Sequence, residues 1–147
     1  MESNKILEII NRLKFFENFN ATEKEKIIST NAQFAIYKDG EKIISEGDRD
    51  ANLFVLLSGS ASVSKNGSDT VLATLEAGQI FGEMSFLTHS TRITNITSSN
   101  NAITLKIDDK LMNDLDISIR EKLKDKIIEK LVSTITDMNN KIISQSF

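Results

Sequence analysis

One short segment, residues 81–95, holds side chains suited to binding a phosphate ester. Gly82 allows the backbone to approach a ligand closely, and the residues after it can begin a short helix whose free N–H groups favour an anion. Arg92, ten positions later, offers a planar guanidinium that can donate to two phosphate oxygens. Glu83 supplies an acceptor for a sugar hydroxyl. A surface carboxylate and a solvated arginine beside a turn would look the same, so these residues alone leave both interpretations open.

The composition disfavours several kinds of catalytic site. The chain has no Cys, which excludes thiolate nucleophiles, iron–sulfur clusters and Cys-type zinc sites. His89 is the single histidine, so no cluster of His ligands can hold a metal. A cupin-type metalloenzyme and a metal-dependent phosphodiesterase are disfavoured for the same reason. We therefore expect no metal site in this protein.

Length and charge limit the partners of the chain. Its 147 residues suffice for one ordinary domain with a real core. The 18 basic and 21 acidic residues give a net charge of −3, whereas a protein that binds nucleic acid over a broad face is normally basic. No apolar run reaches the roughly 18 residues of a membrane span, and the first residues do not resemble a secretory signal. We expect a cytoplasmic protein with no nucleic-acid partner and no membrane span.

The elements that must position these side chains are indicated by the glycines. All six lie between residues 40 and 82, and the chain has no proline. Such a concentration predicts short strands joined by tight turns, as in a sandwich, a jelly roll or a small barrel. The flanks without glycine are free to form helices. The expected order is helix, then strands, then helix.

Apolar residues recur at helical spacing in both flanks. Ile6 to Leu13 form one predicted helix, and a capping box from Thr22 to Glu25 predicts the start of a second. Residues 117–143 carry an apolar stripe with spacings of three and four. A helix of this length cannot lie wholly against so small a roll. Part of its stripe must face another partner, which is a second chain, the N-terminal helices or a ligand.

Several ordered blocks resemble the cyclic nucleotide-binding domain family. Phe-Gly-Glu at residues 81–83, followed by Arg92, is similar to its phosphate-binding cassette. Gly-Glu-Lys-Ile-Ile-Ser-Glu-Gly-Asp at residues 40–48 and the Ser-Gly-containing stretch at residues 53–63 resemble further blocks of the family. The segment Ala-Gly-Gln-Ile at residues 77–80 completes the match before the cassette. The resemblance covers nearly the whole chain.

The resemblance implies a mixed α+β fold that is mainly β. Its centre would be a double-stranded β-helix, also called a jelly roll or β-roll, at residues 33–107, with the cassette at residues 81–95. Residues 1–32 would form the N-terminal helices, and residues 108–147 a hinge and a long C-terminal helix. The whole chain, residues 1–147, would then be a single cyclic nucleotide-binding domain.

The resemblance also implies the roles of the site residues. Arg92 would hold the exocyclic phosphate oxygens and Glu83 would accept a hydrogen bond from the ribose 2′-hydroxyl. Gly82 and nearby backbone amides would line the sugar-phosphate pocket, and Ser85 stands where the family usually has Ala. The expected ligand-binding residues are Phe81, Gly82, Glu83, Met84, Ser85, Arg92, Ile93, Thr94 and, on the C-terminal helix, Thr134.

Departures from the family pattern bear on the choice of nucleotide. Thr91 replaces a common Pro, which predicts a less preorganised loop. Ile93 stands where cAMP-selective members commonly have Ala and cGMP-responsive members have Thr or Ser. Because Ile93 has no hydroxyl to reach a guanine, cAMP is favoured over cGMP. The base would be capped by Thr134 or by an apolar lid that includes Met138 and Ile142.

The function predicted from the sequence is a non-catalytic sensor. It would bind a 3′,5′-cyclic nucleotide, with cAMP favoured, and signal to an effector protein by moving its C-terminal helix, which could also pair two copies as a homodimer. One alternative is a degenerate β-roll that serves as an oligomerisation or protein-docking module. The presence of Gly82, Glu83 and Arg92 argues against it, because an unpaired buried arginine is costly. A cGMP-selective sensor is the other alternative.

Overall fold

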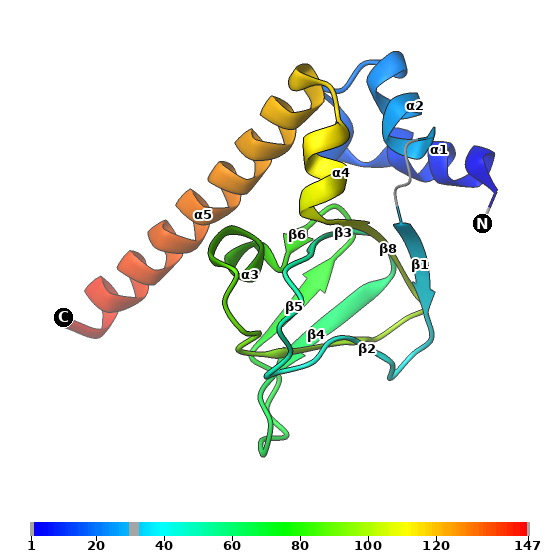
Figure 1. Cartoon of the computed structure of the whole chain (residues 1–147). Coiled ribbons are helices and arrows are strands. Elements are labelled where there is room, and N and C mark those ends of the chain that lie inside the picture. Colours follow the sequence, from blue (N-terminus) through cyan, green and yellow to red (C-terminus); the bar gives the residue numbers. More distant parts are fainter. Residues whose placement is uncertain (1, 30–32, 147) are drawn as a thin grey trace.

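Short strands fill the middle of the chain, where the glycines lie (Figure 1). The computed structural model describes residues 2–29 and 33–146. Within them, eight strands form two four-stranded antiparallel sheets, with the orders β1-β8-β3-β6 and β2-β7-β4-β5. The strands are β1 (Gln33–Tyr37), β2 (Lys42–Ile44), β3 (Leu53–Ser58), β4 (Ser60–Ser64), β5 (Ala73–Glu76), β6 (Ile80–Phe81), β7 (Asn95–Ser98) and β8 (Ala102–Ile107). The mainly β interior predicted from the sequence is confirmed.

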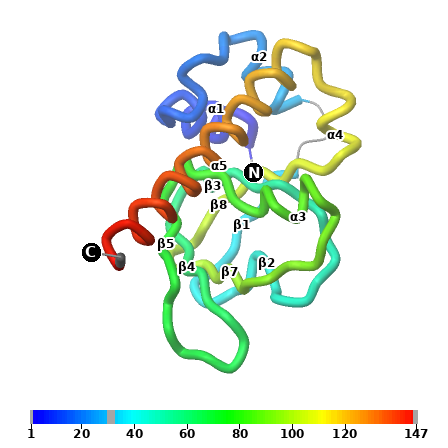
Figure 2. Tube along the Cα trace, turned by 90° about the vertical axis from the view of Figure 1, so that its left-hand side faces the viewer, coloured from blue at the N-terminus to red at the C-terminus, as the bar shows by residue number. Residues whose placement is uncertain are grey.

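Helices occupy the flanks and one short segment inside the roll. Figures 1 and 2 show most of them gathered at one end of the roll, from which the last helix extends to the C-terminus. The described helices are α1 (Ser3–Arg12), the 3-10 turn η1 (Lys14–Phe16), α2 (Ala21–Ser29), α3 (Glu83–Thr88), α4 (Asp109–Asp114) and α5 (Ile117–Ser146). The predicted order of helix, strands and helix is therefore also confirmed.

Strand β3 is buried on both of its faces. Leu53, Val55 and Leu57 point into a large apolar cluster that includes the helices. Phe54 and Leu56 point into a second, smaller cluster inside the roll. Side chains alternate across a strand, so two buried faces produce the continuous apolar run seen in this part of the sequence. This strand separates the helical layer from the interior of the roll.

Three phenylalanines anchor the N-terminal helices to the large cluster. Phe15, Phe16 and Phe19 are all buried, with ring centroids 4.8 Å apart for the first pair and 5.5 Å apart for Phe16 and Phe19. Burial of each ring removes a large apolar area from water. The three rings therefore attach the N-terminal helices to the core.

The start of α2 differs from the sequence prediction. The capping box is formed by Asn20 and Glu23, not by the pair that begins at Thr22. Asn20 Oδ1 accepts from the Glu23 amide at 2.8 Å, and Glu23 Oε1 accepts from the Asn20 amide at 2.9 Å. Asparagine caps helices as well as serine and threonine do. The two capping residues are three positions apart, as predicted, but the box places the start of α2 at Ala21, two residues before the start that a box at Thr22 predicts.

Helix α5 has a packed half and an exposed half. Ile119, Leu123 and Ile127 are buried in the large cluster. Lys122 of this half forms an ion pair with Glu23 of α2 at 2.5 Å, and Asp116, directly before α5, pairs with Lys26 of α2. Farther along, six apolar side chains are more than half exposed: Ile128, Val132, Ile135, Met138, Ile142 and Ile143. The expectation that the roll covers only part of this helix is confirmed.

None of the described helices combines sufficient length with sufficient apolar character to cross a bilayer.

Candidate functional site

The cassette residues line a cavity inside the roll. Its volume is about 270 Å³, and strands β2, β4, β5 and β7 form one wall while β6, α3 and the loop after α3 form the other. Lys130 of α5 lies at its edge. The cavity is lined by Ile44, Val63, Ala73, Leu75, Phe81, Gly82, Glu83, Met84, Ser85, Arg92, Ile93, Thr94, Ile96 and Lys130. All eight cassette residues predicted to bind a ligand are in this set.

Arg92 is positioned by backbone bonds on both sides of its Cα atom. Its amide donates to the Asp48 carbonyl and its carbonyl accepts from the Gly47 amide, each at 2.8 Å. Strand β7 begins three residues later, at Asn95, where it pairs with β4. These bonds direct the arginine side chain inward, and the residue is only 4% exposed.

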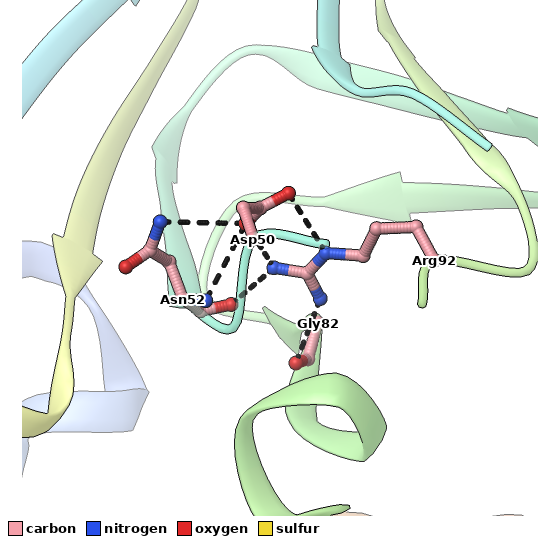
Figure 3. Close-up of polar contacts among 4 residues, drawn as sticks. All are labelled: Asp50, Asn52, Gly82 and Arg92. Atoms are coloured by element: carbon pink, nitrogen blue, oxygen red, sulfur yellow. Dashed lines mark hydrogen bonds and ion pairs between the residues drawn. The ribbon is translucent and has the colours of Figure 1, made fainter. Parts of the chain in front are cut away.

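The guanidinium of Arg92 is surrounded by acceptors (Figure 3). Nε donates to Asp50 Oδ2 at 3.1 Å and Nη2 donates to Asp50 Oδ1 at 2.6 Å, a bidentate ion pair. Nη2 also donates to the Asn52 carbonyl at 2.5 Å, and Nη1 donates to the Gly82 carbonyl at 3.0 Å. A guanidinium has five N–H groups. Among the described residues four are engaged, so one N–H on Nη1 is left for a ligand without any rearrangement.

Asp50 is held in its charged form by this contact. Burial disfavours its ionisation, but the hydrogen bonds and the positive charge of Arg92, with further bonds from Asn52, lower the pKa of Asp50 below its ordinary value. The pair places a fixed negative charge behind the guanidinium. Asp50 therefore orients Arg92 within the wall of the cavity.

Gly82 is required by the backbone and by the space around it. Its φ of +78° lies in the left-handed region that other residues rarely adopt. A Cβ atom at this position would lie 2.9 Å from Arg92 Nη1 and 2.9 Å from the Asn52 carbonyl oxygen. Gly82 thus lets the start of α3 approach the arginine.

Glu83 and Lys130 form the second polar group of the cavity. Lys130 Nζ lies 3.7 Å from Glu83 Oε1, and the Glu83 side chain is 13% exposed. The same ammonium donates to the Ile80 carbonyl at 2.7 Å. The carboxylate of the cassette and the long helix are therefore in contact.

Apart from these charged groups and from Ser85 and Thr94, the side chains that line the cavity are apolar. Its inner wall includes Ile44, Leu75 and Ile96, which belong to the smaller cluster. At the mouth, Met84 and Ile93 are exposed by 54% and 68%. An anion, a hydroxyl-bearing ring and a flat apolar group would each find a matching surface here.

The residues predicted on the C-terminal helix lie away from the cavity. Thr134 is exposed, does not line the cavity, and donates through Oγ1 to the Lys130 carbonyl at 2.9 Å. Met138 and Ile142 are also exposed and absent from the cavity wall. Figure 1 shows the C-terminal part of α5 extending away from the roll, and Lys130 is the residue of this helix that lines the cavity.

Three contributors to the site were missed in the sequence. Asp50 and Asn52 hold Arg92 from 40 or more positions away, and Lys130 reaches the cassette from α5. Asp50 stands in a polar turn and Lys130 on a charged helix, so neither has a local pattern that singles it out. Among the described residues, no group of three or more His, Cys, Asp or Glu side chains is arranged to hold a metal ion.

Comparison with known families agrees with this geometry. The family model described as "Cyclic nucleotide-binding domain" matches residues 35–115, which is more than half of the chain. The chain belongs to the cyclic nucleotide-binding domain family. The matched region contains every strand after β1 together with the cassette.

Similar proteins in this family include kinases and regulatory subunits. The cAMP-dependent protein kinase regulatory subunit of Mycosarcoma maydis is 33% identical over 86 residues, 57% of this chain and 16% of that protein. The cGMP-dependent protein kinase of Toxoplasma gondii is 34% identical over 102 residues, 69% of this chain and 10% of that protein. The chain thus spans less than a fifth of the length of either relative.

Solved structures share the fold. A cyclic nucleotide-binding domain from Methylobacillus flagellatus superposes with a TM-score of 0.78 at 22% identity, covering 99% of this chain and 84% of that one. The catabolite activator protein of Thermus thermophilus gives a TM-score of 0.75 at 21% identity, covering 90% of this chain and 62% of that one. The predicted β-roll with flanking helices is confirmed by this similarity.

Proposed function

We propose that this domain is a non-catalytic sensor that binds a 3′,5′-cyclic nucleotide, with cAMP favoured over cGMP. One observation carries the proposal. Glu83 and Arg92, an acceptor and a buried cation, line the same cavity, whose remaining wall is largely apolar. A cyclic nucleotide carries the three complementary parts, which are an anionic phosphate, a ribose hydroxyl and a flat base.

In the proposed complex, the cyclic phosphate meets the Arg92 side of the cavity. The free N–H on Nη1 binds one phosphate oxygen, and the other N–H on Nη1 is shared between the Gly82 carbonyl and a second phosphate oxygen. Asp50 keeps its bidentate contact and holds the guanidinium in place. Glu83 accepts from the ribose 2′-hydroxyl, while the amides of Ser85 and Thr94 face the sugar and the phosphate.

The preference for cAMP rests on Ile93. Its apolar side chain lines the cavity next to Arg92 and has no hydroxyl to bind a guanine. Relatives named for cAMP and for cGMP both match this chain, so both nucleotides belong in the test. Binding without hydrolysis is supported by the match to relatives that are named regulatory subunits.

Isothermal titration calorimetry with cAMP, cGMP and 5′-AMP tests the proposal. Arg92→Ala should weaken cAMP binding by about 2–4 kcal/mol, or roughly 30- to 1000-fold, because it removes a buried charge-assisted contact. The matched control is Arg49→Ala, since Arg49 is exposed and lies outside the cavity. Equal binding by wild type and Arg92→Ala would refute the site. Binding of none of the three nucleotides would instead favour a docking module.

For the output, we propose that the exposed half of α5 pairs two copies of the chain. Its exposed apolar side chains at 128, 135, 138 and 142, together with the partly buried Leu131, follow the alternating spacings of three and four residues that a coiled coil needs. Movement of this helix on ligand binding would then reach an effector protein through the dimer. A molecule that remains strictly monomeric by light scattering, with and without cAMP, would contradict the homodimer.

A further inference from the structure

Lys130 is the part of the cavity wall that comes from outside the roll. Its ammonium donates to the Ile80 carbonyl at 2.7 Å and lies 3.7 Å from Glu83 Oε1. The side chain of Lys130 is 30% exposed and that of Glu83 is 13% exposed. An ammonium and a carboxylate therefore face one another across the edge of the cavity, partly shielded from water.

The distance between these two groups is longer than a direct hydrogen bond. Such bonds span about 2.7–3.2 Å between nitrogen and oxygen. A hydroxyl oxygen about 2.8 Å from both atoms fits the separation, because a hydroxyl can donate to the carboxylate and accept from the ammonium at once. The pair supplies one acceptor and one donor, which is the complement of an alcohol.

We propose that Lys130 and Glu83 together bind one sugar hydroxyl of the ligand, so that Lys130 is a specificity-determining residue for ribose against 2′-deoxyribose. This inference rests on the proposed function, since it takes a cyclic nucleotide as the ligand. It adds a donor from α5 to the acceptor from α3. The bound hydroxyl then links the two helices directly.

The Ile80 contact makes Lys130 suitable for this role. An ammonium has three N–H donors, so Lys130 can keep its bond to the Ile80 carbonyl and still donate to a hydroxyl. That carbonyl belongs to β6, immediately before the cassette. The ammonium is thus held at a fixed place beside Glu83 before any ligand arrives, which lowers the ordering cost of binding.

Titration of cAMP and 2′-deoxy-cAMP into wild type and Lys130→Met tests the inference. The measured quantity is the ratio of the dissociation constant for 2′-deoxy-cAMP to that for cAMP. Lys130→Met also removes the contact with the Ile80 carbonyl. This loss changes the dissociation constants for cAMP and 2′-deoxy-cAMP by the same factor, so its effect cancels in the ratio. We expect Lys130→Met to lower the ratio by about five- to tenfold, because it removes one charge-assisted hydrogen bond to the hydroxyl.

Lys126→Met is the matched control. Lys126 lies one turn earlier on α5, pairs with Glu129 at 3.8 Å and does not line the cavity, so its loss should leave the ratio unchanged. Lys130→Leu replaces Lys130→Met if the latter lacks a cooperative thermal transition. An unchanged ratio in the Lys130 variant, with cAMP binding still lost in Arg92→Ala, would overturn this inference and leave the proposed function standing. Wild type that binds neither nucleotide would overturn both.

Discussion

Replacing Asp50 with alanine should destabilise the domain, because it leaves the buried guanidinium of Arg92 without its counter-charge. The substitution removes the 2.6 Å and 3.1 Å bonds to the carboxylate and keeps those to the two carbonyls. Breaking a fully buried ion pair costs about 3–5 kcal/mol. The Asp50 side chain is 33% exposed, so water can partly replace it, and we expect about 2 kcal/mol.

Urea unfolding at pH 7 measures this loss as a change in the free energy of unfolding. For a domain of this size, about 2 kcal/mol lowers Tm by roughly 4–8 °C. Asp48→Ala is the matched control, because Asp48 is exposed two positions away in the same turn. A variant at position 50 that unfolds within about 0.5 kcal/mol of wild type, as ordinary surface substitutions do, would refute the reasoning.

The pH dependence of the same variant has a defined sign. The pKa of Asp50 is lowered in the folded chain. The stability that ionised Asp50 contributes to the folded state is therefore fully present above the ordinary aspartate pKa of about 3.9. This stability is lost as the pH falls through the lowered pKa of the folded state. The stability difference between wild type and Asp50→Ala should therefore be constant near neutrality and shrink below about pH 4.

Three further substitutions address separate parts of the molecule. Gly82→Ala should cost about 1–3 kcal/mol in stability and abolish cAMP binding in calorimetry, because its Cβ would enter a left-handed, crowded position. Glu23→Gln should lower the urea midpoint at pH 7. The hydrogen bond from Lys122 outweighs burial and lowers the pKa of Glu23, so the stability difference between wild type and this variant should shrink below about pH 4. Ile135→Asp should abolish the homodimer in light scattering, since Ile135 is 57% exposed. Its unfolding temperature should match that of wild type only at protein concentrations where wild type is dissociated, because association stabilises the folded chain.

Features with a local cause could be predicted from the sequence. The strands follow from glycine-marked turns and apolar runs. The exposed half of α5 follows from its length. Both depend on residues a few positions apart, where turn chemistry and periodicity act directly. The cassette was indicated by its resemblance to the family, because Gly82, Glu83 and Arg92 alone also fit a solvated turn.

Features that depend on contacts between distant parts of the chain could not be predicted from the sequence. Asp50 was missed because its carboxylate meets Arg92 across 42 positions, and nothing in a polar turn shows which carboxylate will be buried. Lys130 was missed because it is one of several lysines on α5, and only the path of that helix brings it to the cassette. The position of Thr134 along the helix predicts a place at the site, but its side chain is exposed and does not line the cavity.

The two buried faces of β3 bear on how the molecule unfolds. Leu53, Val55 and Leu57 belong to the large cluster with the helices, whereas Phe54 and Leu56 belong to the smaller cluster inside the roll. Because both clusters include side chains of β3, neither cluster can come apart without disturbing the packing of the other. The helical end and the ligand-side end should consequently melt as one cooperative unit. The backbone amides of β3 should then be among the slowest in the chain to exchange with deuterium, released only when the entire domain opens.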